Sequence, residues 1–355
     1  MSTATAPVSV ALPSFATAPL VPVETPPGSA PDSATRYPIR RRLGFALLAA
    51  LGLLGPVACG PVEPDQALTM QATGEPDPRI VATPPNAFII NQPTVNSLWG
   101  ASDKDVWGAG NDGMMIHWDG KAWGRIAVPT GVDLMAIWGA SDKDIWAVGE
   151  AGVVIHWDGT SWSRTTTPVP DSATLNDVWG TSGSNVWAVG DRGVIIQYNG
   201  SGWGAFPLPT INNLLTVWAS GTTDAWIGAD LGMLLHWDGT SWSEFASGGA
   251  SPFIHIRGTA SNKVYAVKRD QDLWAYDGTK WSRVTSANGT KIWVTSDNDL
   301  WVYDSSDTYR YNGTTWTSWY LSGLTALWTP GPTSAWALTT SNILRFSGSS
   351  WSANW

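Results

Sequence analysis

Cysteine is almost absent from this chain, which has one, Cys59, among 355 residues. A single cysteine excludes an internal disulfide framework and a zinc site built on several thiolates. Charged residues make up only 14% of the chain, and Asp and Glu outnumber Lys and Arg by 29 to 20. Because binding to a phosphate backbone needs clustered positive charge, this composition argues against a nucleic-acid partner.

Motifs of the common enzyme classes are also missing. The chain has no Gly-x-Ser-x-Gly elbow, no His-Glu-x-x-His zinc motif and no phosphate-binding glycine loop of the Gly-x-x-x-x-Gly-Lys-Ser/Thr type. A retaining glycosidase needs two carboxyl groups about 5 Å apart, whereas most Asp residues here recur at turn positions of a repeat. We therefore predict no catalytic residues, no cofactor and no metal, and hence a protein that is not an enzyme.

Long apolar runs are confined to one segment, Leu43–Leu54, which follows three arginines at 40–42. A basic stretch, an apolar stretch and small residues before a cleavage point are typical of a bacterial export signal. Cys59 directly follows Ala58, a placement that resembles a lipobox, although Pro56 stands where a lipobox usually has Leu. The resemblance implies that Cys59 is lipidated. Ordinary cleavage after Ala58 and an uncleaved anchor are the alternatives.

Four regions follow from these patterns. Residues 1–38 are predicted to be a disordered extension, which a start codon assigned too early would also explain. Residues 39–59 are the signal and lipobox-like segment, residues 60–93 a proline-rich linker, and residues 94–355 the folded domain. Phe88–Ile90, a short apolar run in the linker, is a candidate for one extra strand that joins the two ends of the domain.

Tryptophan, by contrast, is abundant: the chain has 25, none before Trp99. Most of them belong to a pattern of four aromatic positions that recurs seven times, and 27 of its 28 positions are aromatic. Repeat starts are 35 to 41 residues apart, close to the period of a propeller blade. The seven copies are Trp99, Trp107, Trp118, Trp123; Trp138, Trp146, Trp157, Trp162; Trp179, Trp187, Tyr198, Trp203; Trp218, Trp226, Trp237, Trp242; Arg257, Tyr265, Tyr276, Trp281; Trp293, Trp301, Tyr311, Trp316; and Trp328, Trp336, Phe346, Trp351.

Each copy is predicted to form four short strands. Polar clusters such as residues 140–144 and Asp-Gly pairs such as Asp158-Gly159 are typical of tight hairpin turns, and the runs between them are rich in Val, Ile and Trp. One such sheet is too small to be stable alone, whereas seven in a ring cover one another. We predict an all-β fold: a seven-bladed β-propeller of four-stranded antiparallel blades, preceded by a disordered, signal-bearing N-terminal region.

The repeat resembles known families. The run Trp138–Gly149, with the turn and tryptophan that follow it, looks like the Trp-rich propeller repeats of bacterial surface lipoproteins. Asp158–Trp162 is similar to an Asp-box that lacks the leading Ser/Thr and the residue between Asp and Gly. Val264–Val267 and Leu300–Tyr303 are similar to tectonin repeats. These families imply a propeller but no single activity, because Asp-boxes occur in sialidases, lectins and scaffolds alike.

Three histidines, His117, His156 and His236, precede the third aromatic position of their own copies. They suggest a metal site at first sight, but equivalent positions of different blades lie apart around a ring, whereas zinc needs its ligands about 2 Å away. We interpret them as partly exposed strand histidines.

The fifth copy departs from the pattern, with Arg257 in place of the first tryptophan and His255 on the same side of the same predicted strand. Two readings stay open: Arg257 holds an anionic group in the central channel, or it packs against an aromatic neighbour. In the second case Arg257→Trp should leave stability equal or higher. The candidate partner surface comprises His255, Arg257, Lys268, Arg269, Trp274 and Trp319, the last two being tryptophans outside the repeat.

The sequence thus predicts a monomeric, non-catalytic binding or scaffold protein of the bacterial cell envelope. It is expected as an outer-membrane or periplasmic lipoprotein, or alternatively as a secreted protein. Its partner is a protein or a polysaccharide, and it meets the membrane only through the lipid anchor. A lectin-like propeller is the alternative, and an Asp-box glycoside hydrolase a further one.

Overall fold

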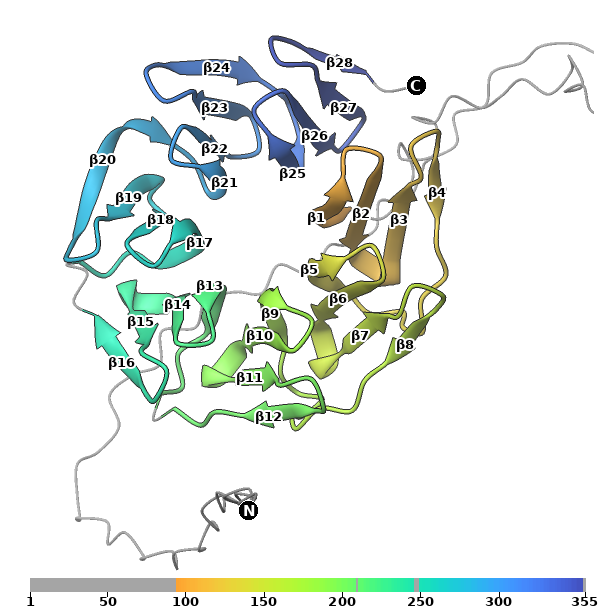
Figure 1. Ribbon diagram of the computed structural model, residues 1–355, viewed down its shortest axis with the longest axis vertical. Coiled ribbons are helices and arrows are strands. Elements are labelled where there is room, and N and C mark those ends of the chain that lie inside the picture. Colours follow the sequence, from red (N-terminus) through yellow and green to blue (C-terminus); the bar gives the residue numbers. More distant parts are fainter. Residues whose placement is uncertain (1–93, 209, 246–248, 354–355) are drawn as a thin grey trace, which may run out of the picture. The chain divides into compact units, whose positions relative to one another are not determined.

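A computed structural model describes residues 94–353, apart from 209, 246–248 and the side chains of 285 and 286. Cys59, the apolar signal run and Phe88–Ile90 lie outside the described residues. The described chain forms seven sheets around a ring, which confirms the predicted propeller (Figure 1). Its helices are short 3₁₀ turns, and no described helix has the length and hydrophobicity that crossing a membrane requires.

Each blade has four strands. Blades one to four are β1 (Val95–Ser102), β2 (Asp105–Gly110), β3 (Met114–Trp118), β4 (Trp123–Arg125); β5 (Leu134–Ser141), β6 (Asp144–Gly149), β7 (Val154–Trp157), β8 (Trp162–Arg164); β9 (Leu175–Ser182), β10 (Asn185–Gly190), β11 (Ile195–Tyr198), β12 (Trp203–Ala205); and β13 (Leu214–Gly221), β14 (Asp224–Ala229), β15 (Leu234–Trp237), β16 (Trp242–Phe245). Blades five to seven are β17 (Phe253–Ala260), β18 (Lys263–Lys268), β19 (Asp272–Tyr276), β20 (Trp281–Asn288); β21 (Lys291–Ser296), β22 (Asp299–Tyr303), β23 (Asp307–Tyr311), β24 (Trp316–Tyr320); and β25 (Leu324–Gly331), β26 (Ser334–Thr339), β27 (Ile343–Phe346), β28 (Trp351–Ala353).

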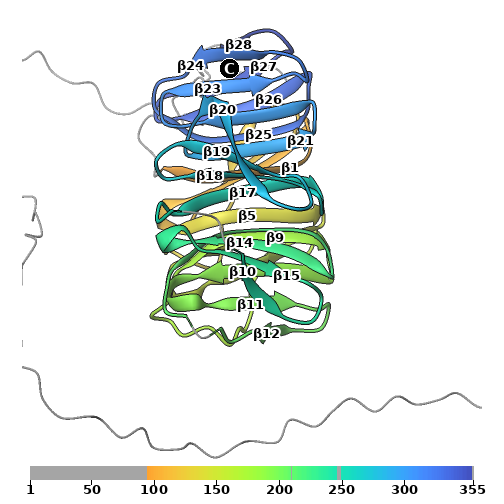
Figure 2. The same cartoon turned by 90° about the vertical axis from the view of Figure 1, so that its left-hand side faces the viewer.

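Strand order within every sheet follows the chain, and neighbouring strands are antiparallel. The first strand of each blade is innermost and the fourth outermost (Figure 1). No strand is shared between two of the seven described sheets, so blade seven meets blade one by packing and not through a common sheet. Figure 2 shows the ring from its side, with the sheets following one another around the circumference.

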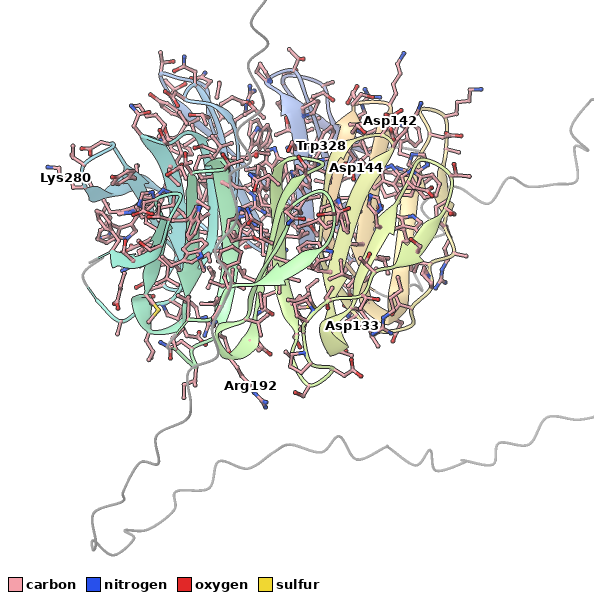
Figure 3. The ribbon with its side chains drawn as sticks, turned by 60° about the horizontal axis from the view of Figure 1, so that its bottom comes forward. Asp133, Asp142, Asp144, Arg192, Lys280 and Trp328 are labelled. Atoms are coloured by element: carbon pink, nitrogen blue, oxygen red, sulfur yellow. The ribbon has the colours of Figure 1, made fainter. Side chains whose placement is uncertain are left out.

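Turn residues define the two faces of the ring. The turn between the third and fourth strands closes as predicted, because Asp158 Oδ1 accepts the N–H groups of Thr160 and Ser161, both at 2.8 Å, and Gly159 takes φ 89°. Asp142 and Asp144, beside the first hairpin turn, lie on one face, which we name the turn face (Figure 3). Arg192, in a 3₁₀ turn, and Asp133, in the connection between blades one and two, lie on the opposite face (Figure 3).

The second aromatic position supplies the core between blades. In six of the seven seams between neighbouring blades, its tryptophan packs against the third and fourth aromatic residues of the next blade, with ring centroids 4.8–5.8 Å apart. Each large aromatic side chain buries about 150–250 Å². The seams are therefore the hydrophobic core of the molecule. The six tryptophans are Trp107, Trp146, Trp187, Trp226, Trp301 and Trp336.

The first aromatic position explains the Trp-Gly pairs of the repeat. Trp99 leans over Gly139 of blade two so closely that a Cβ there would stand 2.7 Å from the indole. The same contact joins Trp138 to Gly180, Trp218 to Gly258 and Trp328 to Gly100. Glycine at these places leaves room for the indole of a neighbouring blade, and at Gly100, Gly180 and Gly258 a carbonyl oxygen of the same hairpin is also within 2.9 Å of the Cβ position.

Candidate functional site

Arg257 lies at the centre of the ring, not on its surface. Its side chain starts from the innermost strand β17 and is only 8% exposed. Nη1 lies 3.2 Å from Oδ2 of Asp177 in blade three and donates to the carbonyl oxygens of Val217 and Ile256. The guanidinium also stands 4.6 Å from the ring centroid of Trp179. Arg257 therefore faces the channel, as the interpretation of an anion site required. The anionic group beside its guanidinium, however, is Asp177 of the same chain.

Two tryptophans meet across the channel. Trp179 of blade three and Trp293 of blade six have ring centroids 6.1 Å apart, at an interplanar angle of 62°. The residue that would receive each indole on the next blade is Ala219 or Thr329 instead of glycine, so the indole cannot lie over it. Each donates its Nε1 hydrogen to the carbonyl oxygen of that residue, at 3.2 and 3.0 Å. Side chains thus join opposite blades at this level of the channel.

Asp177 is a buried carboxylate with its hydrogen bonds satisfied. Oδ1 accepts the N–H of Val178, while Oδ2 accepts the Thr216 hydroxyl at 2.8 Å and the N–H of Val217 at 3.0 Å, beside Arg257. Burying a carboxylate is costly unless a counter-charge and hydrogen bonds compensate. Both the counter-charge and the hydrogen bonds are present, so the pair with Arg257 is part of the packed interior.

His255 and Lys291 complete the channel cluster. His255 Nδ1 accepts the N–H of Ile292 at 3.4 Å, and burial, together with the charges of Arg257 and Lys291, lowers the pKa of its imidazole well below the usual range. Lys291 Nζ donates to the carbonyl oxygens of Thr325 and Asn96, at 2.6 and 3.1 Å, and so ties blade six to blades seven and one. Burial lowers the pKa of Lys291 to about 8. Each of these polar groups has a partner within the ring.

The other predicted surface residues are scattered. Lys268 is buried, and its Nζ lies 4.6 Å from the ring centroids of both Phe253 and Trp274. Trp274 is half-buried beside it. Arg269 is 61% exposed, with Nη2 3.7 Å from Oδ1 of Asp230. The six predicted residues therefore do not form one surface.

Trp319 requires a correction. It was expected outside the core because it falls outside the repeat, yet it is half-buried and stacks on Trp301, with centroids 5.8 Å apart. It also packs against Phe346 of blade seven at 5.3 Å. Trp319 holds a place like that of Phe206 beside Trp187 and of Phe245 beside Trp226. It is part of the seam between blades six and seven.

The three histidines stay in their own blades. His117, His156 and His236 each stack on the second tryptophan of their blade, with centroids 4.0–4.2 Å apart. Each Nε2 lies 2.6–2.8 Å from a carboxylate of the same blade. Within residues 94–353 no three His, Cys, Asp or Glu side chains gather as metal ligands would. The arrangement agrees with the interpretation of these residues as partly exposed strand histidines.

The seam between blades five and six differs from the other six. Its second aromatic position is Tyr265 instead of tryptophan, and no described ring pair joins Tyr265 to blade six. A cavity of about 310 Å³ lies there instead. We name it the seam pocket; its lining residues are Tyr265, Leu273, Val284, Asp297, Leu300, Tyr311 and Trp316. The pocket thus opens between the residues that hold an indole in every other seam.

Aromatic rings and one carboxylate dominate the lining of the seam pocket. Tyr311 and Trp316 are 5.3 Å apart and tilted by 39°, and the Tyr311 hydroxyl donates to the carbonyl oxygen of Gly313. Asp297 is exposed and accepts the hydroxyl of Thr259 on Oδ1 at 2.7 Å. Burial, together with Asp297 and Tyr311, raises the pKa of the Tyr265 phenol. The phenol is therefore uncharged at neutral pH.

Sequence reasoning singled out blade five but missed this pocket. The signal was the shorter second aromatic residue, Tyr265, together with Ala275, which lies directly opposite it across the strand pair. In blades one, two and four a histidine stands at the position of Ala275 and stacks on the tryptophan. The sequence pattern counts Tyr and Trp as equivalent aromatic residues, but in the seam a tyrosine fills less space than a tryptophan.

Comparisons with known proteins identify the architecture alone. No protein-family model matches the chain, and neither does any curated protein. Solved structures match over most of the chain. YCF48 bound to D1 peptide has 14% identity and a TM-score of 0.57, covering 73% of this chain and 94% of that one. YCF48 from Cyanidioschyzon merolae has 15% identity and a TM-score of 0.56, covering 72% of this chain and 95% of that one. The WD40 β-propeller domain of Doa1 has 9% identity and a TM-score of 0.62, covering 72% of this chain and 92% of that one. The fold is a shared one.

Proposed function

We propose that this protein is a non-catalytic binding protein that holds a segment of a partner protein at the seam between blades five and six. The observation that carries the proposal is the seam pocket. Six seams are filled by an indole, while the seventh leaves about 310 Å³ with aromatic walls. That volume is at the lower end of the range found for ligand sites, about 300–1,000 Å³.

The comparisons support the class of function. YCF48, a propeller of similar architecture, has been solved bound to a peptide. A ring of this kind is therefore able to carry a peptide site, although so low an identity does not transfer the site itself to this chain.

The lack of catalysis is part of the same proposal. Asp119, Asp158, Asp238 and Asp277 each accept hydrogen bonds from N–H groups of their own turns. His117, His156 and His236 each lie against a carboxylate of their own blade. These groups already have local structural partners, which supports a binding role over a hydrolytic one.

We further propose that the protein works at the bacterial cell envelope, attached through Cys59. This part rests on the order of the arginines, the apolar run and Cys59 in the sequence. Replacing Cys59 with Ser should move the protein from the membrane fraction to the soluble exported fraction. A wild-type chain that never incorporates labelled fatty acid would contradict the anchor.

Partner binding is tested by filling the seam pocket. The tagged full chain, its Tyr265→Trp variant and a Tyr320→Trp control are used to capture envelope proteins, which are quantified by mass spectrometry. Tyr320 is 72% exposed on the outermost strand of blade six, so the control adds the same indole outside the pocket. We expect a protein that is enriched by the wild type and the control and lost with Tyr265→Trp. Equal capture by all three would refute the site, and a polysaccharide as the captured species would favour the lectin alternative.

A further inference from the structure

The seam pocket combines features suited to an organic cation. Tyr265, Tyr311 and Trp316 supply three aromatic rings, whose faces carry negative potential. Leu273 and Leu300 supply a buried apolar floor. Aromatic walls of this kind attract a cation through the ring quadrupole and accommodate its alkyl groups at the same time.

The charge in the lining of the seam pocket is negative. Asp297 is the only charged residue in the lining. Its Oδ1 accepts the Thr259 hydroxyl, and no other described hydrogen bond to its carboxylate is seen. Arg283, on the neighbouring strand β20, is paired with Asp272, its Nη2 2.6 Å from Oδ1. The rim therefore favours a positively charged ligand.

Hydrogen-bonding capacity in the seam pocket is low, which argues against a sugar. The Tyr311 hydroxyl already donates its hydrogen bond to the carbonyl oxygen of Gly313. The other polar side-chain groups of the lining are the Tyr265 hydroxyl, the Trp316 ring nitrogen and Asp297. A sugar carries many hydroxyl groups that need partners when buried. An alkylated ammonium group needs none, because its charge is met by ring faces and a carboxylate.

We propose that the seam pocket binds an alkylated ammonium group, such as trimethylammonium, presented by a methylated lysine side chain of the partner protein. This inference rests on the proposed function for the location of the partner but adds the chemistry that is recognised. Tyr265, Tyr311 and Trp316 enclose the cation, and Asp297 at the rim meets its charge. The repeat provides the pocket by leaving out one indole.

The experiment compares a cation with its neutral isostere. Binding of choline and of 3,3-dimethyl-1-butanol to the full chain is measured by saturation-transfer NMR and calorimetry, together with a short peptide that carries trimethyllysine and the same peptide with norleucine. We expect choline and the trimethyllysine peptide to bind and the two neutral probes to bind at least tenfold more weakly, as cation–π attraction in a desolvated site implies. Equal binding of charged and neutral probes would overturn the inference.

Two variants and a matched control locate the site. Tyr265→Trp fills the pocket and should abolish choline binding, with a melting temperature equal to or above the wild type. Asp297→Asn keeps the shape and should weaken binding roughly fivefold, the effect of removing one partly exposed counter-charge. Asp142→Asn changes an exposed carboxylate at the same repeat position of blade two and should leave binding unchanged. Choline binding that survives Tyr265→Trp would place the cation elsewhere and overturn the proposal.

Failure of this inference is distinguishable from failure of the proposed function. If a partner protein is lost with Tyr265→Trp while no probe binds, the partner site stands and the ammonium chemistry is wrong. If phosphatidylcholine vesicles bind through the pocket and the trimethyllysine peptide does not, the presentation of the group by a protein is wrong. If neither a partner nor a probe depends on Tyr265, both proposals fail.

Discussion

Arg257 carries the counter-charge of a carboxylate that has almost no contact with water. Asp177 and Arg257 come from blades three and five, and their side chains are 7% and 8% exposed. Removing one partner of a buried ion pair leaves the other unpaired, which typically costs about 3–5 kcal/mol. The pair therefore matters for stability in a way that a surface arginine would not.

The first prediction reverses the expectation that Arg257→Trp is neutral or stabilising. We now expect Arg257→Trp and Arg257→Met to lower the free energy of unfolding by about 3–5 kcal/mol. The double variant Asp177→Asn with Arg257→Met should recover part of the loss, because no unpaired charge remains. Urea denaturation measures all three. A single variant as stable as the wild type would show that the channel pair is dispensable.

The second prediction concerns pH and His255. Burial and the charges of Arg257 and Lys291 lower the pKa of His255 in the folded state, so the unfolded chain binds the proton more readily. Stability is then fully present above the unfolded pKa of about 6.5 and falls as the pH drops below it. Urea midpoints at pH 7.5 and 5.5 should differ more for the wild type than for His255→Gln. An equal difference in both chains would contradict the assignment.

At the scale of single elements, the innermost strands interlock through tryptophan and glycine. The indole of one blade lies where the next blade has no side chain, and a Cβ at Gly139 would stand 2.7 Å from Trp99. Where Ala or Thr replaces that glycine, the indole turns toward the channel instead. One residue on a strand thus decides whether a neighbouring tryptophan fills a seam or the axis.

The third prediction tests this interlock. Gly139→Ala should lower stability by about 1–3 kcal/mol, the usual cost of forcing an extra methyl group into a packed interior. Gly204→Ala is the control, because a Cβ there meets nothing within 4 Å. Thermal unfolding of both variants separates the steric contact from the general effect of replacing glycine. A similar shift for the two would argue that the contact is easily relieved.

The elements were largely predictable from the sequence, and their cross-ring partners were not. Asp158-Gly159 and its equivalents signal hairpins because their geometry is local. The pairing of Arg257 with Asp177 depends on a ring that brings together residues 80 apart, and nothing local announces it. Tyr265 was visible as a departure, but the space it leaves depends on two rings of blade six. Trp319 was misplaced because the repeat pattern says nothing of a residue that packs between its positions.

At the scale of the whole molecule, the ring closes between its last and first blades as it closes elsewhere. Trp336 packs on Trp118 and Trp123 with centroids 5.1 and 5.5 Å apart. Blade seven has Ser334 where blades one, two, four and six have a carboxylate, and its Arg345 is paired with Asp103 of blade one. The closing seam therefore has the core of the other seams and an added ion pair.

The fourth prediction compares the closing seam with an interior one. Trp336→Ala and Trp187→Ala each remove a fully buried indole and should both cost about 3–5 kcal/mol. Parallel denaturant titrations give the two values. A much smaller cost for Trp336→Ala would mean that the closing seam contributes less than its geometry implies.

The fifth prediction concerns Phe88–Ile90, which lies outside the described residues. If this run adds a strand that joins the ends of the ring, deleting residues 60–93 should lower the melting temperature. A chain that starts at residue 94 and melts at the same temperature as the full chain would identify the segment as a plain tether.

The seams give each blade two unlike sides. In six of the seven seams one side projects an indole and the other receives it against two aromatic rings, so the blades are joined head to tail. Separate subunits with such faces form cyclic oligomers when the rotation per step closes the circle. A fragment of three or four blades would expose one face of each kind and assemble with copies of itself or with the complementary fragment. The chain can thus be regarded as a ring-shaped oligomer whose subunits share one backbone.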